Sequence, residues 1–332
     1  MYLPKFKLCV SCMTYNHASF ISDAMSGFCS QQTNFPFVCC IVDDASTDGE
    51  QQVIKEYMQK HFDLLNSALA YQIETEYGQV IFAQHKMNKN CFFAVLLLKE
   101  NHYRKKIGYK KFQYLKQWRE RCTYEALCEG DDYWINENKL QMQVDFLDKH
   151  DDYSVCSHRI KKYDQDEKVF FEDRLEPLFK DNQGCNFDNR SKIWISETSS
   201  IVYRLAAHEE YKNYPFEKRD NVHLYFLLKY GKGFCLSNVM SVYRLHQGGI
   251  FSKQNLDARL LNGGYKALKN LYNFEKTPDA RYLYYRNYAL TFLLTKGRIL
   301  FKEPFNLRKF ISLPYFILSI VIGIHPIYKK VK

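Results

Sequence analysis

The 332-residue sequence predicts an α/β protein with a mostly parallel sheet flanked by helices. Short apolar runs at residues 7–13 and 37–42 each end in a polar cluster, and a segment with helical spacing follows each cluster. Strands and helices that alternate in this way form crossover connections between parallel strands. Ligands of such sheets bind beyond the carboxyl ends of the strands, which is where both polar clusters fall.

Each further element follows from the same kind of pattern. In the first two predicted helices, residues 18–32 and 50–62, apolar side chains recur on one side, as with Phe20, Ala24 and Phe28. The later elements are apolar runs or periodic segments between turn signals: strand candidates at residues 68–75, 80–84, 124–128, 155–158, 199–203 and 234–243, and helices at residues 139–150 and 222–230, the latter ended by Gly231. Residues 256–310 read as two or three helices.

Composition narrows the class of protein and of partner. Hydrophobic residues make up 46% and charged residues 25%, which excludes a disordered chain, a collagen-like fibre and a disulfide mini-protein. The net charge of +10 favours an anionic partner, namely nucleic acid, a phosphorylated small molecule or an anionic membrane.

The cysteines favour a reducing compartment. Their number is odd, 11, and many lie in apolar runs, where a thiol packs as a small hydrophobe. Cys9 and Cys12 have the spacing of a metal or redox pair, but no second pair lies at zinc-ribbon spacing, so we expect a structural role. No secretory signal is visible in residues 1–10, and we expect a cytoplasmic protein.

Two segments stand apart from the predicted sheet. Residues 101–121 are strongly basic and aromatic, a pattern typical of a solvated helical face, with a phosphate-facing surface or single-stranded nucleic acid binding as alternatives. Residues 311–328 lack Asp, Glu, Lys and Arg, and basic residues flank them. We expect residues 311–332 to lie on the inner face of the cytoplasmic membrane, with docking on protein or a true span as alternatives.

Two acidic clusters, at residues 43–48 and 129–132, follow predicted strands. Grouped carboxylates need a cation to neutralise them, and hard oxygen ligands select Mg²⁺ or Mn²⁺. Asp131 and Asp132, together with Asp43, Asp44 and His246, therefore predict a divalent metal that binds a diphosphate.

Three runs of residues carry a resemblance to a known family. They are residues 10–17 (VSCMTYNH), 42–49 (VDDASTDG) and 129–134 (EGDDYW), and together they resemble glycosyltransferase family two, in its bacterial surface-polysaccharide branch. The resemblance covers roughly residues 5–250. It implies a GT-A fold and a nucleotide-activated sugar as donor. We expect a catalytic domain over residues 1–250, a helical extension over residues 251–310 and the tail over residues 311–332.

The resemblance also implies donor-side roles for single residues. It assigns nucleotide binding to Thr14, Tyr15, Asn16, Asp44, Asp131 and Arg244, with Tyr15 stacking on the nucleobase and Asp44 accepting from its imide. Asp132 and His246 match the metal ligands, and Asp131 would sit near the ribose. Uridine is the expected base.

On the acceptor side, the resemblance implies a carboxylate base at Asp220, which precedes a helix. Two features differ from the family pattern. Arg219 stands where the family has an acidic residue, and Glu217 offers an alternative base. As a further alternative, Asp220 would only cap the helix. Trp194, Glu197 and Thr198 match the acceptor-side loop.

Together these patterns predict an inverting, metal-dependent transferase that moves a sugar from a nucleotide donor to a lipid-linked or glycan acceptor. A catalytically inactive sugar-nucleotide binder and a nucleic-acid-binding module that uses residues 101–121 are the alternatives. A nucleotidyltransferase would need a Gly-rich basic loop after the first strand, where this chain has Thr14-Tyr15-Asn16-His17. The oligomeric state stays open.

Overall fold

The computed structural model describes residues 4–66, 68–171, 173, 176–179, 184–191, 196–249 and 255–295. Trp194 and the tail at residues 311–332 lie outside the described residues.

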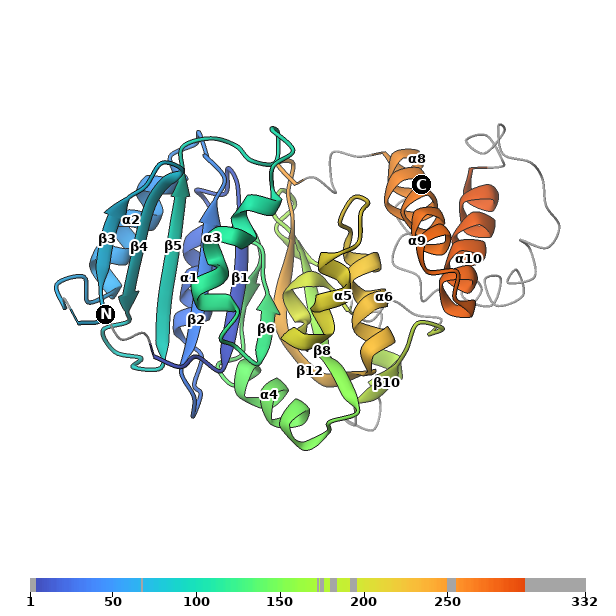
Figure 1. Cartoon of the computed structure of the whole chain (residues 1–332), viewed down its shortest axis with the longest axis horizontal. Helices are drawn as coiled ribbons and strands as arrows, with labels where there is room; N and C mark the ends of the chain where they lie inside the picture. Colours follow the sequence, from blue (N-terminus) through green and yellow to red (C-terminus); the bar gives the residue numbers. More distant parts are fainter. Residues whose placement is uncertain are drawn as a thin grey trace.

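A 12-stranded mixed sheet runs across the molecule (Figure 1). Ten strands follow the order β10-β12-β8-β11-β6-β1-β2-β5-β4-β3, while β7 pairs with β12 and β9 with β8. The strands are β1 (Leu8–Thr14), β2 (Phe37–Asp43), β3 (Tyr71–Glu74), β4 (Gly78–Gln84), β5 (Cys91–Leu98), β6 (Tyr124–Leu127), β7 (Tyr133–Trp134), β8 (Tyr153–Asp164), β9 (Val169–Phe170), β10 (Cys185–Phe187), β11 (Val202–Arg204) and β12 (Lys232–Leu245).

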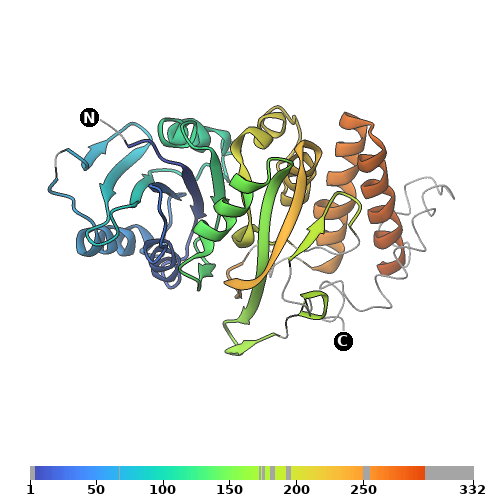
Figure 2. The ribbon, with the colours of Figure 1, turned by 90° about the horizontal axis from the view of Figure 1, so that it is seen from below.

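Helices cover both faces of this sheet (Figure 2). On one face α1 (Ile21–Cys29), α2 (Glu50–His61) and α4 (Lys139–Lys149) share a core with β1 and β2. On the other face lie α3 (Tyr109–Arg119) and α6 (Asp220–Tyr230). The short elements are η1 (Glu176–Phe179), η2 (Thr198–Ser200), η3 (Leu205–His208) and α5 (Glu209–Lys212).

The middle of the sheet places the site. Strand β1 pairs in parallel with β2 and β6, and Thr14, the last residue of β1, lies beside Asp43, the last residue of β2. The polar residues that follow β1, β2 and β6 therefore leave the sheet at the same edge, as the strand–helix alternation predicts. Antiparallel strands extend this parallel centre on both sides, so the sheet is mixed. The expected α/β class is confirmed.

Burial explains why these segments form central strands. Every residue of β2 is buried, and β1 is buried except Met13, so both read as continuous apolar runs instead of alternating ones. Cys9 and Cys12 lie buried in β1 as free thiols, in agreement with the expected structural role.

Several predicted elements have different bounds or were missed. The central strand β5, eight buried residues, has no counterpart among the predicted elements, although it is a continuous apolar run like β2. The strand expected at residues 199–203 is a 3₁₀ turn, η2, followed by β11. The helix expected at residues 18–32 is shorter, Ile21–Cys29.

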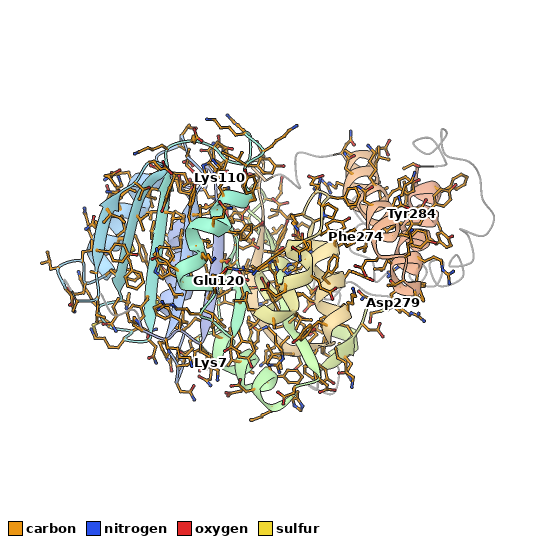
Figure 3. All side chains as sticks on the ribbon, viewed as in Figure 1. Lys7, Lys110, Glu120, Phe274, Asp279 and Tyr284 are labelled. Carbon is orange, nitrogen blue, oxygen red and sulfur yellow. The ribbon has the colours of Figure 1, made fainter. Side chains whose placement is uncertain are left out.

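The basic stretch also departs from a solvated face. It forms a loop and then α3, whose two ends are marked by Lys110 and Glu120 in Figure 3. Lys111 and Arg119 of this helix are buried, so part of the stretch is structural.

The helical extension packs on the sheet domain. It contains α8 (Leu256–Ala258), the π-helical stretch η4 (Arg259–Lys266), α9 (Ala267–Glu275) and α10 (Pro278–Leu294). Leu268, Leu271 and Tyr284 share an apolar cluster with Val222 and Phe226 of α6. An ion pair of 2.6 Å between Arg190 and Asp279 adds a polar contact. In the part of the chain that the structure describes, no helix has the length and apolar character to cross a membrane.

Candidate functional site

The loop after β1 is held by one buried carboxylate. Glu50, the first residue of α2, accepts hydrogen bonds from the Thr14 hydroxyl, from the His17 backbone N–H at 2.8 Å and from the Ser46 hydroxyl at 2.8 Å. Burial raises the pKa of Glu50 to about 7. Asn16 of this loop adopts a left-handed conformation with φ of 58°. The loop is therefore fixed by contacts that its own sequence does not reveal.

Asn16 connects this loop to the one after β2. Its backbone N–H donates to the Ser46 hydroxyl at 2.9 Å, and its side-chain oxygen accepts from the Thr47 N–H at 2.8 Å. A third contact joins the Ala18 N–H to the Asp48 carboxylate at 2.9 Å. Asn16, expected to bind nucleotide, thus also fixes the spacing between the two loops.

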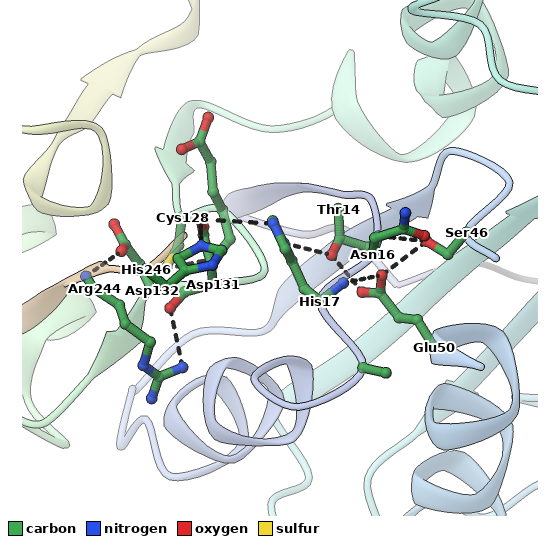
Figure 4. A network of polar contacts seen from close by, with 12 residues as sticks. Thr14, Asn16, His17, Ser46, Glu50, Cys128, Asp131, Asp132, Arg244 and His246 are labelled. Atoms are coloured by element: carbon green, nitrogen blue, oxygen red, sulfur yellow. Dashed lines mark hydrogen bonds and ion pairs between the residues drawn. The ribbon is translucent and has the colours of Figure 1, made fainter. Parts of the chain in front are cut away.

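Two histidines and an aspartate meet where these loops approach β12 (Figure 4). The Asp131 carboxylate lies 3.1 Å from Nε2 of His246 and 3.6 Å from Nε2 of His17. The ring of His17 also lies edge-on to that of His246, with centroids 5.7 Å apart. One ligand atom from each of the three residues falls within 4.8 Å of the other two, so the group could hold a metal ion.

The protonation states of this group suit metal binding. Burial would raise the pKa of Asp131, but the hydrogen bond from His246 and the nearby His17 hold it below its usual value. Burial, the largest effect, lowers the pKa of His17, although the charge of Asp131 acts in the opposite direction. The second carboxylate oxygen of Asp131, Oδ1, is buried without a hydrogen-bond partner within the described residues. Such an orphaned oxygen fits a cation.

Asp132 is tied to β12, and its Oδ2, like Oδ1 of Asp131, is buried without a hydrogen-bond partner among the described residues. Its Oδ1 accepts from the Arg244 backbone N–H at 2.9 Å, and the residue is 1% exposed. Burial, and then the charge of Asp131, raise the pKa of Asp132 well above its usual value. The group of three therefore contains His246 and Asp131, whereas Asp132 braces β12; its expected metal ligation stays a prediction.

Arg244 lies buried beside the same loop. Its guanidinium donates to the Asp23 carboxylate at 2.7 Å and to the Asp131 carbonyl oxygen at 3.1 Å. It stacks between Phe20 and Tyr133, 4.7 and 4.8 Å from the ring centroids. The Arg244 guanidinium therefore contacts the backbone of Asp131, one of the three residues of the candidate metal group.

A further carboxylate, Asp220, lies at the start of α6, and its charge, like that of Asp131, acts on Glu129. Asp220 is exposed to solvent. The surrounding protein nevertheless raises its pKa, first by desolvation and then through the charge of Glu197. Burial and the charges of Asp131 and Asp220 likewise raise the pKa of Glu129 well above its usual value. Arg219, not Asp220, is the N-cap of α6, so the capping alternative for Asp220 is not observed. The alternative base, Glu217, is 67% exposed and pairs with Arg219 at 2.7 Å.

The acceptor-side residues are described in part. Glu197 pairs with Lys162 at 2.9 Å, and Thr198 opens the turn η2 and hydrogen-bonds Asp220. Trp194 lies outside the described residues.

The nucleobase side has an unexpected partner. Asp44 is 3% exposed, and it accepts from the backbone N–H groups of His102 at 2.8 Å and Tyr103 at 3.1 Å. Lys111 forms an ion pair with it at 2.7 Å, and the Arg104 guanidinium lies 5.5 Å from the Tyr15 ring centroid. The basic stretch thus contacts both residues that were expected to hold the nucleobase.

Sequence reasoning missed several residues of this site. His17 lies inside the first motif, and its residue type could have indicated a metal ligand, because histidine commonly binds metals. Glu129 stands in the third motif, and Glu50 follows the second directly. Arg104 and Lys111 had no signal beyond charge, because their contacts join residues distant in the sequence.

Known proteins are similar to this chain at three levels. Residues 9–69 match the family model described as glycosyl transferase family 2. Uncharacterized proteins of Mycobacterium bovis (Mb1547) and Mycobacterium tuberculosis (Rv1520) are each 28% identical over 254 residues, which is 74% of this chain and 61% of the relative. The matched part therefore covers less than two thirds of the length of these relatives.

Two solved structures share the fold. TarS 1–349 of S. aureus in complex with UDP-GlcNAc aligns with a TM-score of 0.59 and 17% identity, over 94% of this chain and 79% of that one. The mannosyltransferase PcManGT of Pyrobaculum calidifontis, in complex with GDP-Man and Mn²⁺, aligns with a TM-score of 0.51 and 11% identity, over 96% and 85%. The GT-A fold implied by the resemblance is confirmed, and the match to the family model covers residues 9–69.

Proposed function

We propose that this protein is an inverting, metal-dependent glycosyltransferase, because residues 9–69 match the model of glycosyl transferase family 2 and the chain has the GT-A fold. It moves a sugar from a nucleoside diphosphate donor, with UDP as the expected nucleotide, to a lipid-linked or glycan acceptor. The observation that carries the proposal is the group of His17, Asp131 and His246, together with Asp220, whose charge, like that of Asp131, acts on Glu129. A cation site beside a carboxylate base meets the two requirements of this reaction.

His17, Asp131 and His246 would hold the divalent metal. Adjacent ligands of an ion bound at about 2.1 Å lie about 3 Å apart, near the 3.1 Å between Asp131 and His246. Two imidazoles favour Mn²⁺ over Mg²⁺, because Mg²⁺ prefers oxygen ligands. When bound, the metal supplies positive charge to a diphosphate leaving group. We therefore assign the carboxylate ligand to Asp131 and a bracing role to Asp132.

Asp220 is the proposed general base. The acceptor hydroxyl oxygen forms a bond to the anomeric carbon, the bond from that carbon to the diphosphate oxygen breaks, and Asp220 takes the hydroxyl proton. A raised pKa makes a carboxylate a stronger base at neutral pH. Arg244, fixed by Asp23, adds positive charge on the diphosphate side.

The acceptor and the cellular place follow from chemistry outside the site. The net charge of +10 and the apolar residues 311–328 favour a peripheral enzyme on the inner face of the cytoplasmic membrane, acting in cell-surface polysaccharide synthesis. Glu197 and Thr198, beside Asp220, are the proposed acceptor contacts.

Titration calorimetry of the purified full chain with UDP, GDP and CDP, each with and without MnCl₂, tests the proposal. We expect Mn²⁺-dependent binding of one nucleotide, followed by release of that nucleotide when donor and acceptor are both present. No binding to any nucleotide by a protein with a cooperative unfolding transition would contradict the donor site.

Arg219 favours a second candidate, a sugar-nucleotide binder without transfer, since it stands where the family has an acidic residue. That protein would bind nucleotide with Mn²⁺ and release none. A nucleic-acid-binding module would instead bind oligonucleotides with a steep salt dependence and without metal.

A further inference from the structure

We propose that the outer side of α3, with the turn before it, binds an anionic membrane surface. The residues concerned, which we call the α3 surface, are the rings of Tyr103, Tyr109 and Phe112 and the lysines Lys105, Lys106 and Lys110. The inference rests on the proposed function, since it names the part of the described chain through which a peripheral transferase contacts lipid.

The α3 surface exposes three aromatic rings. Tyr103 is 66% exposed, Tyr109 60% and Phe112 45%, and they are three of the twelve large apolar side chains that the described residues expose. Tyr109 and Phe112 lie three residues apart on α3, so they share one side of the helix. The opposite side packs through Leu115 and Trp118 in the core that contains β2 and β5. Packing of the inner side therefore turns the rings outward.

Positive charge surrounds these rings. Residues 100–112 carry one exposed carboxylate, Glu100, against four exposed or half-buried cations, namely Arg104, Lys105, Lys106 and Lys110. Glu100 pairs with Lys105, and no ion pair joins Lys106 or Lys110 to a carboxylate of the described residues. Such an excess of positive charge attracts an anionic partner.

Helix α3 is fixed with this side outward. The Arg119 guanidinium donates to both oxygens of Glu125, at 2.9 Å through Nε and 2.6 Å through Nη2, and both residues are buried. In the turn before the helix, the Asn101 side-chain oxygen accepts from the Arg104 N–H at 2.7 Å. A surface that is already ordered loses little conformational entropy when it binds.

A lipid surface fits this arrangement better than single-stranded nucleic acid does. Amphipathic rings among lysines lie at the level of lipid headgroups, and the outer side of a helix meets a flat partner. Nucleic acid needs rings in a charged groove, with faces open to the bases. A hollow of about 510 Å³ beside the second half of α3 contains Tyr77 and Tyr114, but these two rings stack on each other at 3.7 Å. Each of them already has a stacking partner.

The α3 surface lies next to the candidate site. Lys111 of the first turns of α3 is 2.7 Å from Asp44, the residue after β2, and Lys110 marks this end of the helix in Figure 3. The carboxyl ends of β1 and β2 lie at the same edge of the sheet. A membrane on the α3 surface therefore brings a lipid-linked acceptor close to the edge where the sugar is transferred.

Co-sedimentation of the full chain with vesicles tests the inference. We expect binding to vesicles of equal parts phosphatidylglycerol and phosphatidylcholine, and much weaker binding to phosphatidylcholine alone. Lys106→Gln combined with Lys110→Gln should weaken binding to the anionic vesicles about twentyfold, because each cation beside an anionic leaflet contributes about fivefold. Lys55→Gln combined with Lys60→Gln makes the same charge change on α2, which covers the other face of the sheet, and should leave binding unchanged.

The rings have a test of their own. Tyr109→Ser combined with Phe112→Ser should weaken vesicle binding by about tenfold or more, because two rings no longer enter the headgroup region. This loss should persist at high salt, which screens the lysines but not the burial of apolar surface. The exposed Phe170→Ser of β9 is the control.

The outcomes separate this inference from the proposed function. If the lysine variant binds anionic vesicles as the wild type does, or the wild type binds no vesicles, the inference is overturned. It is also overturned if the lysine variant loses affinity for oligo(dT) and keeps its affinity for vesicles, since the surface would then bind nucleic acid. In each case Mn²⁺-dependent UDP binding, measured by calorimetry on the same proteins, decides on the donor site independently.

Discussion

Two Asp-Asp pairs follow buried parallel strands, and the protein treats them differently. After β2, Asp44 meets Lys111 and two backbone N–H groups, so the chain itself neutralises it. After β6, Asp131 faces His17 and His246, and its Oδ1 has no hydrogen-bond partner among the described residues. Both pairs need a cation, but the chain supplies it at only one of them.

The difference shows that an acidic pair after a strand predicts a need for positive charge without saying what meets it. At Asp44 the positive charge comes from Lys111 of α3, 67 residues further along the chain, whereas at Asp131 the loops after β1 and β12 bring the two imidazoles of His17 and His246. A site open to metal is recognised by what the surrounding chain leaves unfilled.

The largest effect is expected at Asp220, the proposed base, which belongs to neither Asp-Asp pair. Asp220→Asn should lower transfer by about a hundredfold or more, because the acceptor proton loses its base. Mn²⁺-dependent UDP binding should be unchanged, and donor turnover with calorimetry measures both. Glu217→Gln, an exposed carboxylate near it in sequence, is the control. Normal transfer by Asp220→Asn would move the base to Glu129 or Glu217.

The two pairs should separate when each is neutralised in turn. Asp131→Asn should weaken UDP binding in MnCl₂ about a hundredfold, because a metal ligand is lost. Asp44→Asn should keep the full ratio between affinities with and without Mn²⁺. Equal loss of that ratio in both variants would show that the pairs act as one site.

The pair that the chain neutralises should matter for folding. Lys111→Met should lower the free energy of unfolding by about 2 kcal/mol, since a buried carboxylate loses its cation while two N–H donors remain. Lys116→Met removes only an exposed partner of Glu120, 3.7 Å away, and should cost about 0.5 kcal/mol or less. Urea unfolding measures both. Equal losses of unfolding free energy in the two variants would show that the Lys111–Asp44 ion pair contributes no more than an exposed one.

A buried pair of histidines, His208 and His223, makes the free energy of unfolding depend on pH. Burial lowers the pKa of His208 to about 2 and that of His223 to about 4. A hydrogen bond of 2.9 Å joins Nδ1 of His208 to Nε2 of His223, and the charges of Glu125 and Arg119 act on both rings. The unfolded chain binds protons below about pH 6.5 where the folded chain does not, so stability falls as pH drops from 6.5 toward 4.

His208→Gln should make this fall shallower by about 1.4 kcal/mol per pH unit, the contribution of one proton. The exposed His150→Gln serves as control. Urea unfolding at several pH values measures the slopes, and equal slopes for wild type and His208→Gln would contradict the assignment.

Local pattern was enough for the parallel centre and for the three motifs. Thr14 and Asp43 end neighbouring strands because each closes an apolar run, and this fixes the edge where the site lies. Strand β5 was missed although it is as fully buried as β2; the polar cluster and helical segment that follow β2 supplied context that the apolar run alone does not give. The expected metal ligation by Asp132 stays a prediction. The structure adds Asp131 as a second candidate, because Asp131 lies within the group of His17 and His246 while Asp132 accepts from the backbone of β12.

The loop after β1 carries Tyr15 and His17 two residues apart, and Glu50 holds both its ends. Under the proposed function, the Tyr15 ring for the base and the His17 ligand for the metal share one short piece of chain. We therefore expect nucleotide and metal to bind cooperatively, and by linkage each should change the affinity of the other by the same factor.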